Sequence, residues 1–383
     1  MKRLVSFAIC FTFLFSFLTF NVSAETPPLS VNAKSALLME AETGTILYEH
    51  NIHEKLPPAS ITKIMTMLLA MDAIKAGQIN YDTIVTGSER AKSMGGSTIY
   101  LDAGEQISVR DLLKGIAVAS GNDACVAIAE HIAGSEEAFV EMMNQRAKEL
   151  GMNDTHFVNT NGLDAEGHVT SAYDVALMSR ELLNKHPEIT EFTTIWIDSL
   201  RGGQFQLANT NKLIRFYPGA NGLKTGSTSK ALFCVSATAK RDNMQLIAVI
   251  MASPTSQERF NAARTLLDYG FANYAIAGGN KGDKIAEVKV SKGEKQTLQV
   301  EAETSYKTLV KKAQKSAVTT HIDLPEQVQA PIKKGDRVGE IKLMVDNEVI
   351  ISSPLVACED VKRISLFSMI KKILGQYLAN KQS

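Results

Sequence analysis

A serine and a lysine lie three residues apart in the stretch LPPASITKIM, residues 56–65. A serine hydroxyl is a poor nucleophile near neutral pH unless a base accepts its proton during attack. Residues three apart on a helix lie one turn apart on the same face, so Lys63 can reach the hydroxyl of Ser60. Burial in an apolar helix disfavours the charged ammonium and leaves an amine that can act as the base. Taken alone the pair is weak evidence, because an ordinary helix cap also explains Ser60.

A second polar group occurs in AVASGNDACVAIAEH, where Ser120-Gly121-Asn122 interrupts two apolar segments. The hydroxyl of Ser120 could relay a proton between Lys63 and a leaving group, and the amide of Asn122 could hold a peptide carbonyl. A helix cap is the alternative interpretation of this triplet.

A third group, Lys224-Thr225-Gly226, opens an apolar strand in NGLKTGSTSKALFCVSATA. It offers an ammonium, a hydroxyl and a residue without Cβ beside a strand edge. Such an edge can pair with an extended peptide, and glycine permits close approach. The alternative is a surface turn.

In this order, S-x-x-K, S-x-N and K-T-G are the signatures of the serine penicillin-interacting enzymes. Over residues 30–275 the chain closely resembles the low-molecular-mass D-alanyl-D-alanine carboxypeptidases, a group of penicillin-binding proteins. The resemblance implies a β-lactamase-like α/β (α+β) fold, in which helices and a helical subdomain cover an antiparallel sheet. The segments that carry it include PPASITKIMT, GGSTIYLDAGE, SGNDACVAIAEHIAGSEEAFVEMMN, GLDAEGHVTSAYDVA, NGLKTG and MQLIAVIMA.

The resemblance also implies an activity. Ser60 would attack the carbonyl between the last two D-alanines of a peptidoglycan stem pentapeptide, release D-alanine and leave an acyl-enzyme that water hydrolyses. Lys63 would be the base, and Ser120 would pass a proton to the departing amine. Penicillin and other β-lactams would acylate the same serine, and no cofactor or metal is expected.

The family pattern assigns the remaining site residues to substrate binding. Asn122 and Lys224 would position the substrate, and Thr225 would bind the terminal carboxylate. Arg259, in SQERFNAAR, would lie near that carboxylate, unless it is a helix-surface arginine. The expected binding residues are Asn122, Lys224, Thr225, Gly226, Ser227 and Arg259, with backbone N–H groups of Ser60 and Ser227 forming the oxyanion hole. His168 is a weaker candidate and is interpreted as structural.

Other functions share parts of this pattern. A class A β-lactamase needs a glutamate in an E-x-x-x-N loop downstream of S-x-N, and residues 154–171, DTHFVNTNGLDAEGHVTS, lack that pattern. An endopeptidase acting on cross-links would use the same machinery. A non-catalytic cell-wall-binding protein could retain the fold without the chemistry. A stable penicillin adduct on Ser60 would separate an enzyme from a binding module.

The beginning of the chain indicates export. Lys2 and Arg3 precede an apolar run from Leu4 to Phe20, and Val22-Ser23-Ala24 supplies small residues for cleavage, so residues 1–24 are interpreted as a signal peptide. An uncleaved anchor is the alternative. The 41 basic and 41 acidic residues balance, and without a basic tract we expect no nucleic-acid partner.

The expected catalytic domain spans residues 25–276. Strands are predicted at Ser35–Met39 and Thr45–Tyr48, and again at Ala231–Ala239 and Met244–Ala252. Between these pairs, residues 80–200 are predicted to be mostly helical, with Ser171 and Asp174 forming a capping box. The predicted helices run from Ile61 to Gly77, Val109 to Val118, Asp123 to Ala133, Glu136 to Leu150, Ser171 to Leu183 and Glu258 to Tyr274.

Two smaller regions follow. Residues 277–357 alternate in the manner of short strands and are expected to form a small β-rich domain. The tail, residues 358–383, is predicted to form a basic amphipathic helix from Val361 to Ala379, lying on the outer face of the cytoplasmic membrane. Docking of that helix on its own protein is the alternative. Cys125 and Cys234 are expected to be small buried hydrophobes.

Overall fold

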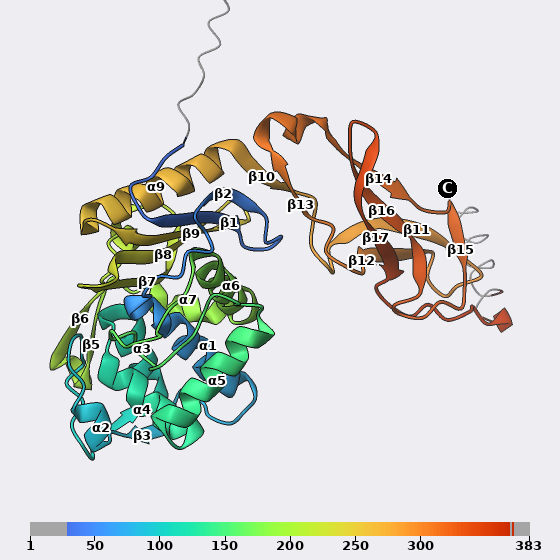
Figure 1. The fold of residues 1–383 in the computed structure, drawn as a ribbon. Coiled ribbons are helices and arrows are strands. Elements are labelled where there is room, and N and C mark those ends of the chain that lie inside the picture. Colours follow the sequence, from blue (N-terminus) through green and yellow to red (C-terminus); the bar gives the residue numbers. More distant parts are fainter. Residues whose placement is uncertain (1–28, 368–369, 371–383) are drawn as a thin grey trace, which may run out of the picture. The chain divides into compact units, whose positions relative to one another are not determined.

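A five-stranded antiparallel sheet forms the centre of the first part of the chain (Figure 1). The computed structural model describes residues 29–367 and residue 370. The strand order is β2-β1-β9-β8-β7, so strands from the beginning of this part lie beside strands from its end. These strands are β1 (Ser35–Glu40), β2 (Ile46–His50), β7 (Ala220–Thr228), β8 (Leu232–Arg241) and β9 (Met244–Ser253).

Helices cover both faces of this sheet, which confirms the predicted layered fold. Leu37 of β1 pairs with Val249 of β9, and β9 is buried along nearly its whole length. A strand buried on both faces needs the continuous apolar run that MQLIAVIMA provides. Figure 1 shows α9 (Ser256–Asn273) on one side of the sheet and α6 (Ala172–Lys185) on the other, and both contact β9.

The segment between β2 and β7 forms the predicted helical region around one central helix. That helix, α1 (Lys63–Lys75), is apolar nearly all round, and α3, α4, α5 and α6 all contact it. Ser171 caps α6 by accepting a hydrogen bond from the Asp174 N–H at 3.2 Å, as its capping box predicted. The other helices are α2 (Glu89–Lys92), α3 (Val109–Ala119), α4 (Asn122–Ala133), α5 (Glu136–Glu149), α7 (Thr190–Thr193) and α8 (Leu213–Phe216).

Two features of this region differ from the predicted elements. The segment Ala59–Thr62 is a 3₁₀ turn, and α1 begins only at Lys63. Two short antiparallel ribbons interrupt the region that was predicted to be mostly helical. They pair β3 (Ile84–Thr86) with β4 (Gln106–Ser108), and β5 (Ile197–Leu200) with β6 (Phe205–Ala208). Their strands have only three or four residues, too few to establish a period of two.

The C-terminal part is an all-β unit with its own apolar core. Its six-stranded sheet has the order β14-β16-β17-β12-β11-β15, and β10 pairs with β13 separately. Leu298, Val300, Ile341 and Leu355 are central to its core. The strands are β10 (Tyr274–Ala277), β11 (Lys284–Ser291), β12 (Thr297–Ala302), β13 (Thr308–Lys311), β14 (Val318–Asp323), β15 (Gln327–Gln329), β16 (Arg337–Val345) and β17 (Glu348–Ala357).

The start of the predicted tail helix was wrong. Val361 pairs with Ile332 and is buried in the core of the β unit, and Arg363 pairs with Gly293. Helix is present only from Leu366 in the part of the tail that the structure describes. The predicted signal peptide and residues 371–383 lie outside the described residues. Within residues 29–367 and 370, no helix is long and apolar enough to cross a bilayer.

Candidate active site

Ser60 and Lys63 meet at the junction between the 3₁₀ turn and α1. The Nζ atom of Lys63 lies 2.8 Å from the Oγ atom of Ser60, which is partly exposed. Lys63 itself is fully buried. The one-turn spacing in the sequence therefore brings the two groups within hydrogen-bonding distance even though the first turn is 3₁₀ rather than α-helical.

Two carbonyl oxygens fix the orientation of the Lys63 amine. Its Nζ donates to the side-chain oxygen of Asn122 at 2.7 Å and to the main-chain oxygen of Asn161 at 2.7 Å. Neither oxygen can donate, so two N–H groups of Lys63 must point at them. The remaining direction faces Ser60. In the neutral amine that direction holds the lone pair, which can accept the Ser60 proton.

Burial favours this neutral form. Removal from water lowers the pKa of Lys63 from its usual 10.5 to about 8, and the nearby Cys125 and Asp123 oppose the shift only in part. The pKa of Lys224 is lowered well below its usual value, first by burial and then by the positive charge of Lys63. The neutral state of Lys63 is therefore favoured by burial, while its positive charge in the protonated state disfavours a second cation at Lys224.

The S-x-N triplet links the end of α3 to the start of α4. Ser120 is buried and adopts a left-handed conformation with φ 65°. Asn122 lies against a separate loop, where its amide N–H group donates to the Gly95 carbonyl at 2.7 Å and its main-chain N–H donates to the Ser97 carbonyl at 2.7 Å. These contacts leave the Asn122 side-chain oxygen directed at Lys63.

Asp123 supports this loop and was not selected from the sequence. Its buried carboxylate accepts hydrogen bonds from the main-chain N–H groups of Ile99, Leu101 and Ala124, at 2.9 to 3.0 Å. The carboxylate thereby attaches residues 99–101 to the start of α4. An acidic residue in the first turn of a helix is common, so the sequence offered no specific signal for this role.

The loop at residues 159–162 was also missed. It supplies the Asn161 carbonyl to Lys63, and Gly162 passes so close to Ala59 that a Cβ there would lie 1.8 Å from the Ala59 oxygen. Gly162 also has φ +91°, which favours glycine. The buried Glu136 holds the loop by accepting from the Thr160 hydroxyl at 3.0 Å. The N-T-N-G turn was the available signal.

The K-T-G strand lies directly beside Ser60. A Cβ on Gly226 would lie 2.7 Å from the main-chain nitrogen of Ser60, so glycine is needed for this approach. Lys224 is buried and donates to the Thr225 carbonyl at 2.9 Å. The Thr225 hydroxyl donates to the Thr210 hydroxyl at 2.7 Å. Ser227 follows Gly226 and is exposed.

Arg259 supports this strand from the first turn of α9. Its side chain is 6% exposed, which excludes the alternative of a helix-surface arginine. One guanidinium nitrogen donates to the carbonyls of Gly226 at 3.2 Å and Cys234 at 3.1 Å. Burial lowers the pKa of Arg259 to about 10, which leaves a cation behind the K-T-G backbone at neutral pH.

His168 has a structural position, as its sequence context indicated. The Val158 N–H donates to its Nδ1 at 2.9 Å, so Nε2 carries the hydrogen and donates to the Thr62 hydroxyl at 2.8 Å. Burial lowers the pKa of His168 to about 4. A neutral imidazole with both nitrogens engaged is unsuited to proton transfer at neutral pH.

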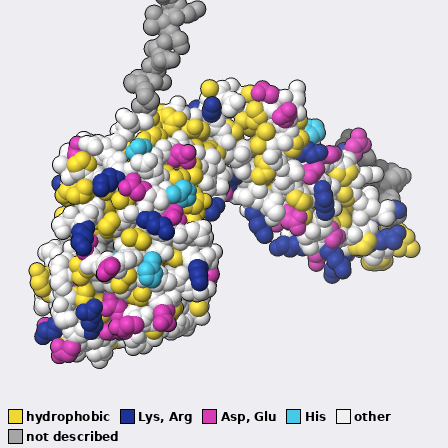
Figure 2. Space-filling model, in the orientation of Figure 1, with side chains coloured by type: hydrophobic (Ala, Val, Ile, Leu, Met, Phe, Trp, Pro, Cys, Tyr) yellow, Lys and Arg dark blue, Asp and Glu magenta, His cyan; other side chains and the backbone are white. Residues whose placement is uncertain are grey.

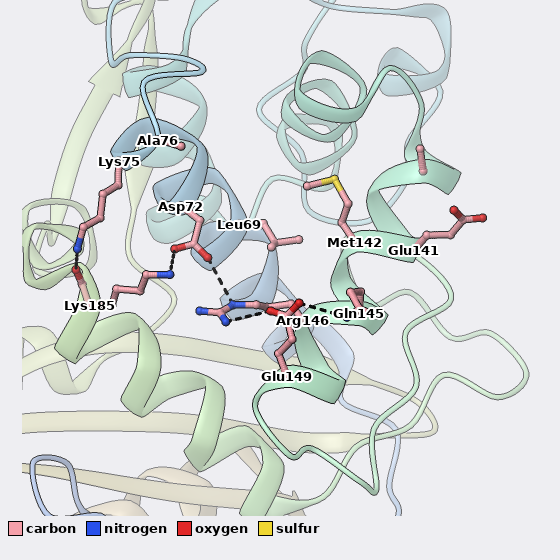
Figure 3. A pocket seen from close by; sticks show the side chains of 11 residues that line it. Leu69, Asp72, Lys75, Ala76, Glu141, Met142, Gln145, Arg146, Glu149 and Lys185 are labelled. Atoms are coloured by element: carbon pink, nitrogen blue, oxygen red, sulfur yellow. Dashed lines mark hydrogen bonds and ion pairs between the residues drawn. The ribbon is translucent and has the colours of Figure 1, made fainter.

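A separate groove lies between the second half of α1 and α5 (Figure 3). It has a volume of about 860 Å³ and is lined by Leu69, Met142 and several charged side chains. Those charges pair with one another, since Asp72 contacts Lys185 at 2.7 Å and Arg146 at 3.4 Å. No residue of the three motifs lines this groove, so it is separate from the site at Ser60.

Comparisons with known proteins agree with this geometry. Residues 21–255 match the family described as D-alanyl-D-alanine carboxypeptidase, and residues 280–363 match the C-terminal domain of penicillin-binding protein 5. The chain is 44% identical to the D-alanyl-D-alanine carboxypeptidase DacF of Bacillus subtilis, over 98% of this chain and 99% of that protein.

Solved structures show the same relationship. Penicillin-binding protein 5 from Haemophilus influenzae is 33% identical, with a TM-score of 0.69 over 88% of this chain and 99% of that one. Penicillin-binding protein D2 from Listeria monocytogenes, in its ampicillin-bound form, is 31% identical with a TM-score of 0.59, over 64% of this chain and all of that one. The motifs, the fold and the relatives together place the chain in the D-alanyl-D-alanine carboxypeptidase family.

Proposed function

We propose that this protein is a penicillin-sensitive serine D-Ala-D-Ala carboxypeptidase, which removes the terminal D-alanine from peptidoglycan stem pentapeptides. The observation that carries the proposal is the buried Lys63 amine, which two carbonyls orient toward the Ser60 hydroxyl. Membership of the family supports the substrate class, because the relatives are named for this activity.

The contact between Lys63 and Ser60 supports the proposed acylation step. Ser60 Oγ attacks the carbonyl carbon between the last two D-alanines while Lys63 takes its proton. The main-chain N–H groups of Ser60 and Ser227 stabilise the oxyanion, a role supported by the contact that Gly226 allows between β7 and Ser60. The C–N bond then breaks as Ser120 delivers a proton to the departing amine. Water subsequently hydrolyses the acyl-enzyme.

The K-T-G strand would bind the carboxylate of the terminal D-alanine. The Thr225 hydroxyl is held by Thr210 and can turn to a carboxylate oxygen of the substrate. Arg259 lies behind the strand, and its positive charge favours a negative charge there. Lys224 lies on the strand itself and would position the substrate. Asn122 would contact the substrate's peptide backbone from the opposite side of Ser60.

Labelled penicillin tests the nucleophile. The protein should acquire a stable adduct on Ser60, and Ser60→Ala should abolish both the adduct and D-alanine release from a pentapeptide. Ser93→Ala, an exposed serine outside the three motifs, is the control and should retain both. The ampicillin-bound structure of the Listeria relative supports the use of this probe. Release of D-alanine by Ser60→Ala at the original rate would refute the assignment.

Substrate preference separates this proposal from an endopeptidase with the same machinery. We expect faster cleavage of a pentapeptide than of a cross-linked dimer, and the reverse order would favour the endopeptidase. Fast penicillin hydrolysis is not expected, because residues 154–171 lack the E-x-x-x-N pattern that supplies the deacylating glutamate of a class A β-lactamase.

We further propose that the protein is exported, acts outside the cytoplasm and binds the outer face of the cytoplasmic membrane peripherally through its C-terminal tail. Leu366, Phe367 and Ile370 are exposed apolar residues at the described start of the tail helix. Exposed basic residues surround the segment from which the tail leaves: Lys292, Lys333, Lys334, Lys362 and Arg363. Figure 2 shows Lys and Arg side chains on the visible face of this β unit. Basic and apolar groups together favour an anionic bilayer surface.

Deletion of residues 366–383 tests this attachment while keeping Val361, which the β unit needs for its core. The shortened protein should move from the membrane fraction to the soluble fraction and still bind penicillin. Continued membrane fractionation would instead support a retained N-terminal anchor.

A further inference from the structure

Tyr100 occupies an unusual place beside the S-x-N loop. Its side chain is 75% exposed, and its φ of 55° lies in a region that bulky side chains rarely adopt. Strained residues persist only where their surroundings hold them, and they gather at functional sites.

Two side chains hold the backbone on either side of this residue. Asp123 accepts from the N–H groups of Ile99 and Leu101, as described above. Arg201 donates to the Ile99 carbonyl at 2.9 Å and to the Tyr100 carbonyl at 3.1 Å. Glu105 in turn fixes Arg201, at 2.6 Å. These contacts hold the strained backbone in place while the Tyr100 ring remains open to solvent.

A second aromatic ring lies against Tyr100. The Phe205 ring meets it edge to face with centroids 5.7 Å apart, and the Arg201 guanidinium lies 5.6 Å from the centre of Phe205. Phe205 begins β6, which leads in five residues to Thr210, the partner of Thr225. The chain therefore runs from the aromatic pair, through β6 and residues 209–210, to the contact between Thr210 and Thr225.

Tyr100 is also connected to the catalytic loop. Asn122 donates its main-chain N–H to Ser97, three residues before Tyr100. Three residues span at most about 10 Å. An extended stem pentapeptide spans about 17 Å at 3.4 Å per residue. A peptide whose last bond lies at Ser60 must continue outward on its amino side for most of that length, and the Tyr100 ring is an exposed group on the segment that Asn122 contacts.

We infer that Tyr100 and Phe205 form an aromatic subsite for the stem-peptide residues on the amino side of the scissile bond. This inference rests on the proposed carboxypeptidase function. Aromatic faces pack well against aliphatic side chains, and two fixed rings lose little conformational freedom when they bind. The subsite would distinguish a long stem peptide from a short acylated D-Ala-D-Ala substrate, which ends before it reaches the rings.

Kinetics with two substrates test the subsite. Tyr100→Ala should lower kcat/KM for a pentapeptide about fivefold, the size expected for one aromatic contact. For an acetylated D-Ala-D-Ala dipeptide, kcat/KM and the rate of penicillin acylation should remain within about twofold. Tyr100→Phe keeps the ring and should retain pentapeptide turnover. Phe216→Ala removes another exposed aromatic ring, outside residues 95–101, and is the matched control.

Two outcomes would overturn the inference. Unchanged pentapeptide kinetics in Tyr100→Ala would show that the ring contacts no substrate. Equal losses for the pentapeptide, the dipeptide and penicillin would show that Tyr100 only supports the S-x-N loop. A wild-type protein that neither releases D-alanine nor binds penicillin would contradict the proposed function instead, and the two failures are therefore distinguishable.

Discussion

Lys63 is the residue on which the proposed chemistry depends. Its amine is buried, and two of its hydrogen-bonding directions are occupied by the oxygens of Asn122 and Asn161. The charged form can donate to Ser60 but cannot accept a proton from it. Only the neutral form can act as base, and burial lowers the pKa of Lys63 to about 8.

The rate of penicillin acylation should therefore rise with pH and level off above a midpoint near 8. Below this pH the lysine is protonated, and above it the amine is free to accept the proton. Lys63→Arg, which keeps a cation at all accessible pH values, should lower the rate by about 10² to 10⁴. Stopped-flow measurement between pH 6 and pH 10 checks both expectations, and a rate independent of pH would exclude Lys63 as the titrating base.

Asp123 gives a prediction about stability. Its carboxylate receives three main-chain N–H groups, and an amide oxygen in its place would leave part of that set unpaired. Asp123→Asn should lower the free energy of unfolding by about 1–3 kcal/mol and slow acylation. Asp82→Asn, at an exposed position, should change neither. Urea unfolding with parallel penicillin labelling makes the comparison, and a fully stable Asp123→Asn protein would contradict this account.

At the scale of elements, the site is formed where β7 meets the turn before α1. The sequence predicted that K-T-G opens the apolar strand that follows it, whereas the structure places K-T-G in the middle of β7 and the apolar run in β8. The sequence also does not show how near β7 comes to Ser60. The Gly226 contact supplies this information, because no side chain fits between the two backbones. The alignment of the oxyanion groups depends on that separation.

Gly226→Ala should therefore slow penicillin acylation by about 10², since a Cβ would force β7 away from Ser60. Gly95→Ala is the matched control: it lies in the wall beside Asn122, but its added Cβ would meet no atom within 4 Å. Circular dichroism should show both variants folded. Normal acylation by Gly226→Ala would mean that β7 does not align the reacting groups.

The helices, strands and loops also differ in how well the sequence predicted them. Helices with regular apolar periods and caps were recognised, as were the two strands β8 and β9 on either side of Asp242-Asn243. The 159–162 loop was not, because Asn161 acts through its main-chain carbonyl, which every residue type possesses. Val361 was assigned to the tail helix because its apolar character suits either a helix face or a β core; the partner Ile332 decides between them.

At the scale of the whole molecule, residues distant in sequence form the site because β1 and β9 close the sheet. The strands predicted at both ends of the catalytic region agree with this closure. The order of the strands within the sheet was not predicted. Pairing among several apolar strands depends on contacts that the pattern of a single strand does not encode. The fold was predicted because the three motifs, in their order along the chain, resemble those of a known family.

The two parts of the chain have separate apolar cores, one within residues 37–252 and another within residues 288–361. Every residue placed in the proposed mechanism lies between Ser60 and Arg259. The Listeria relative matches only 64% of this chain along its whole length, yet its structure holds ampicillin.

A protein comprising residues 25–273 should therefore fold and be acylated by penicillin at a rate within about twofold of the full chain, because the C-terminal β unit contributes no group to the reaction. Heat denaturation followed by circular dichroism would establish that the shortened protein is folded, and labelled penicillin would measure its reaction. A folded protein that fails to react would show that the β unit acts on the catalytic groups. In that case the contacts made by β10 with β13 would be the first to examine, since the shortened protein removes both strands.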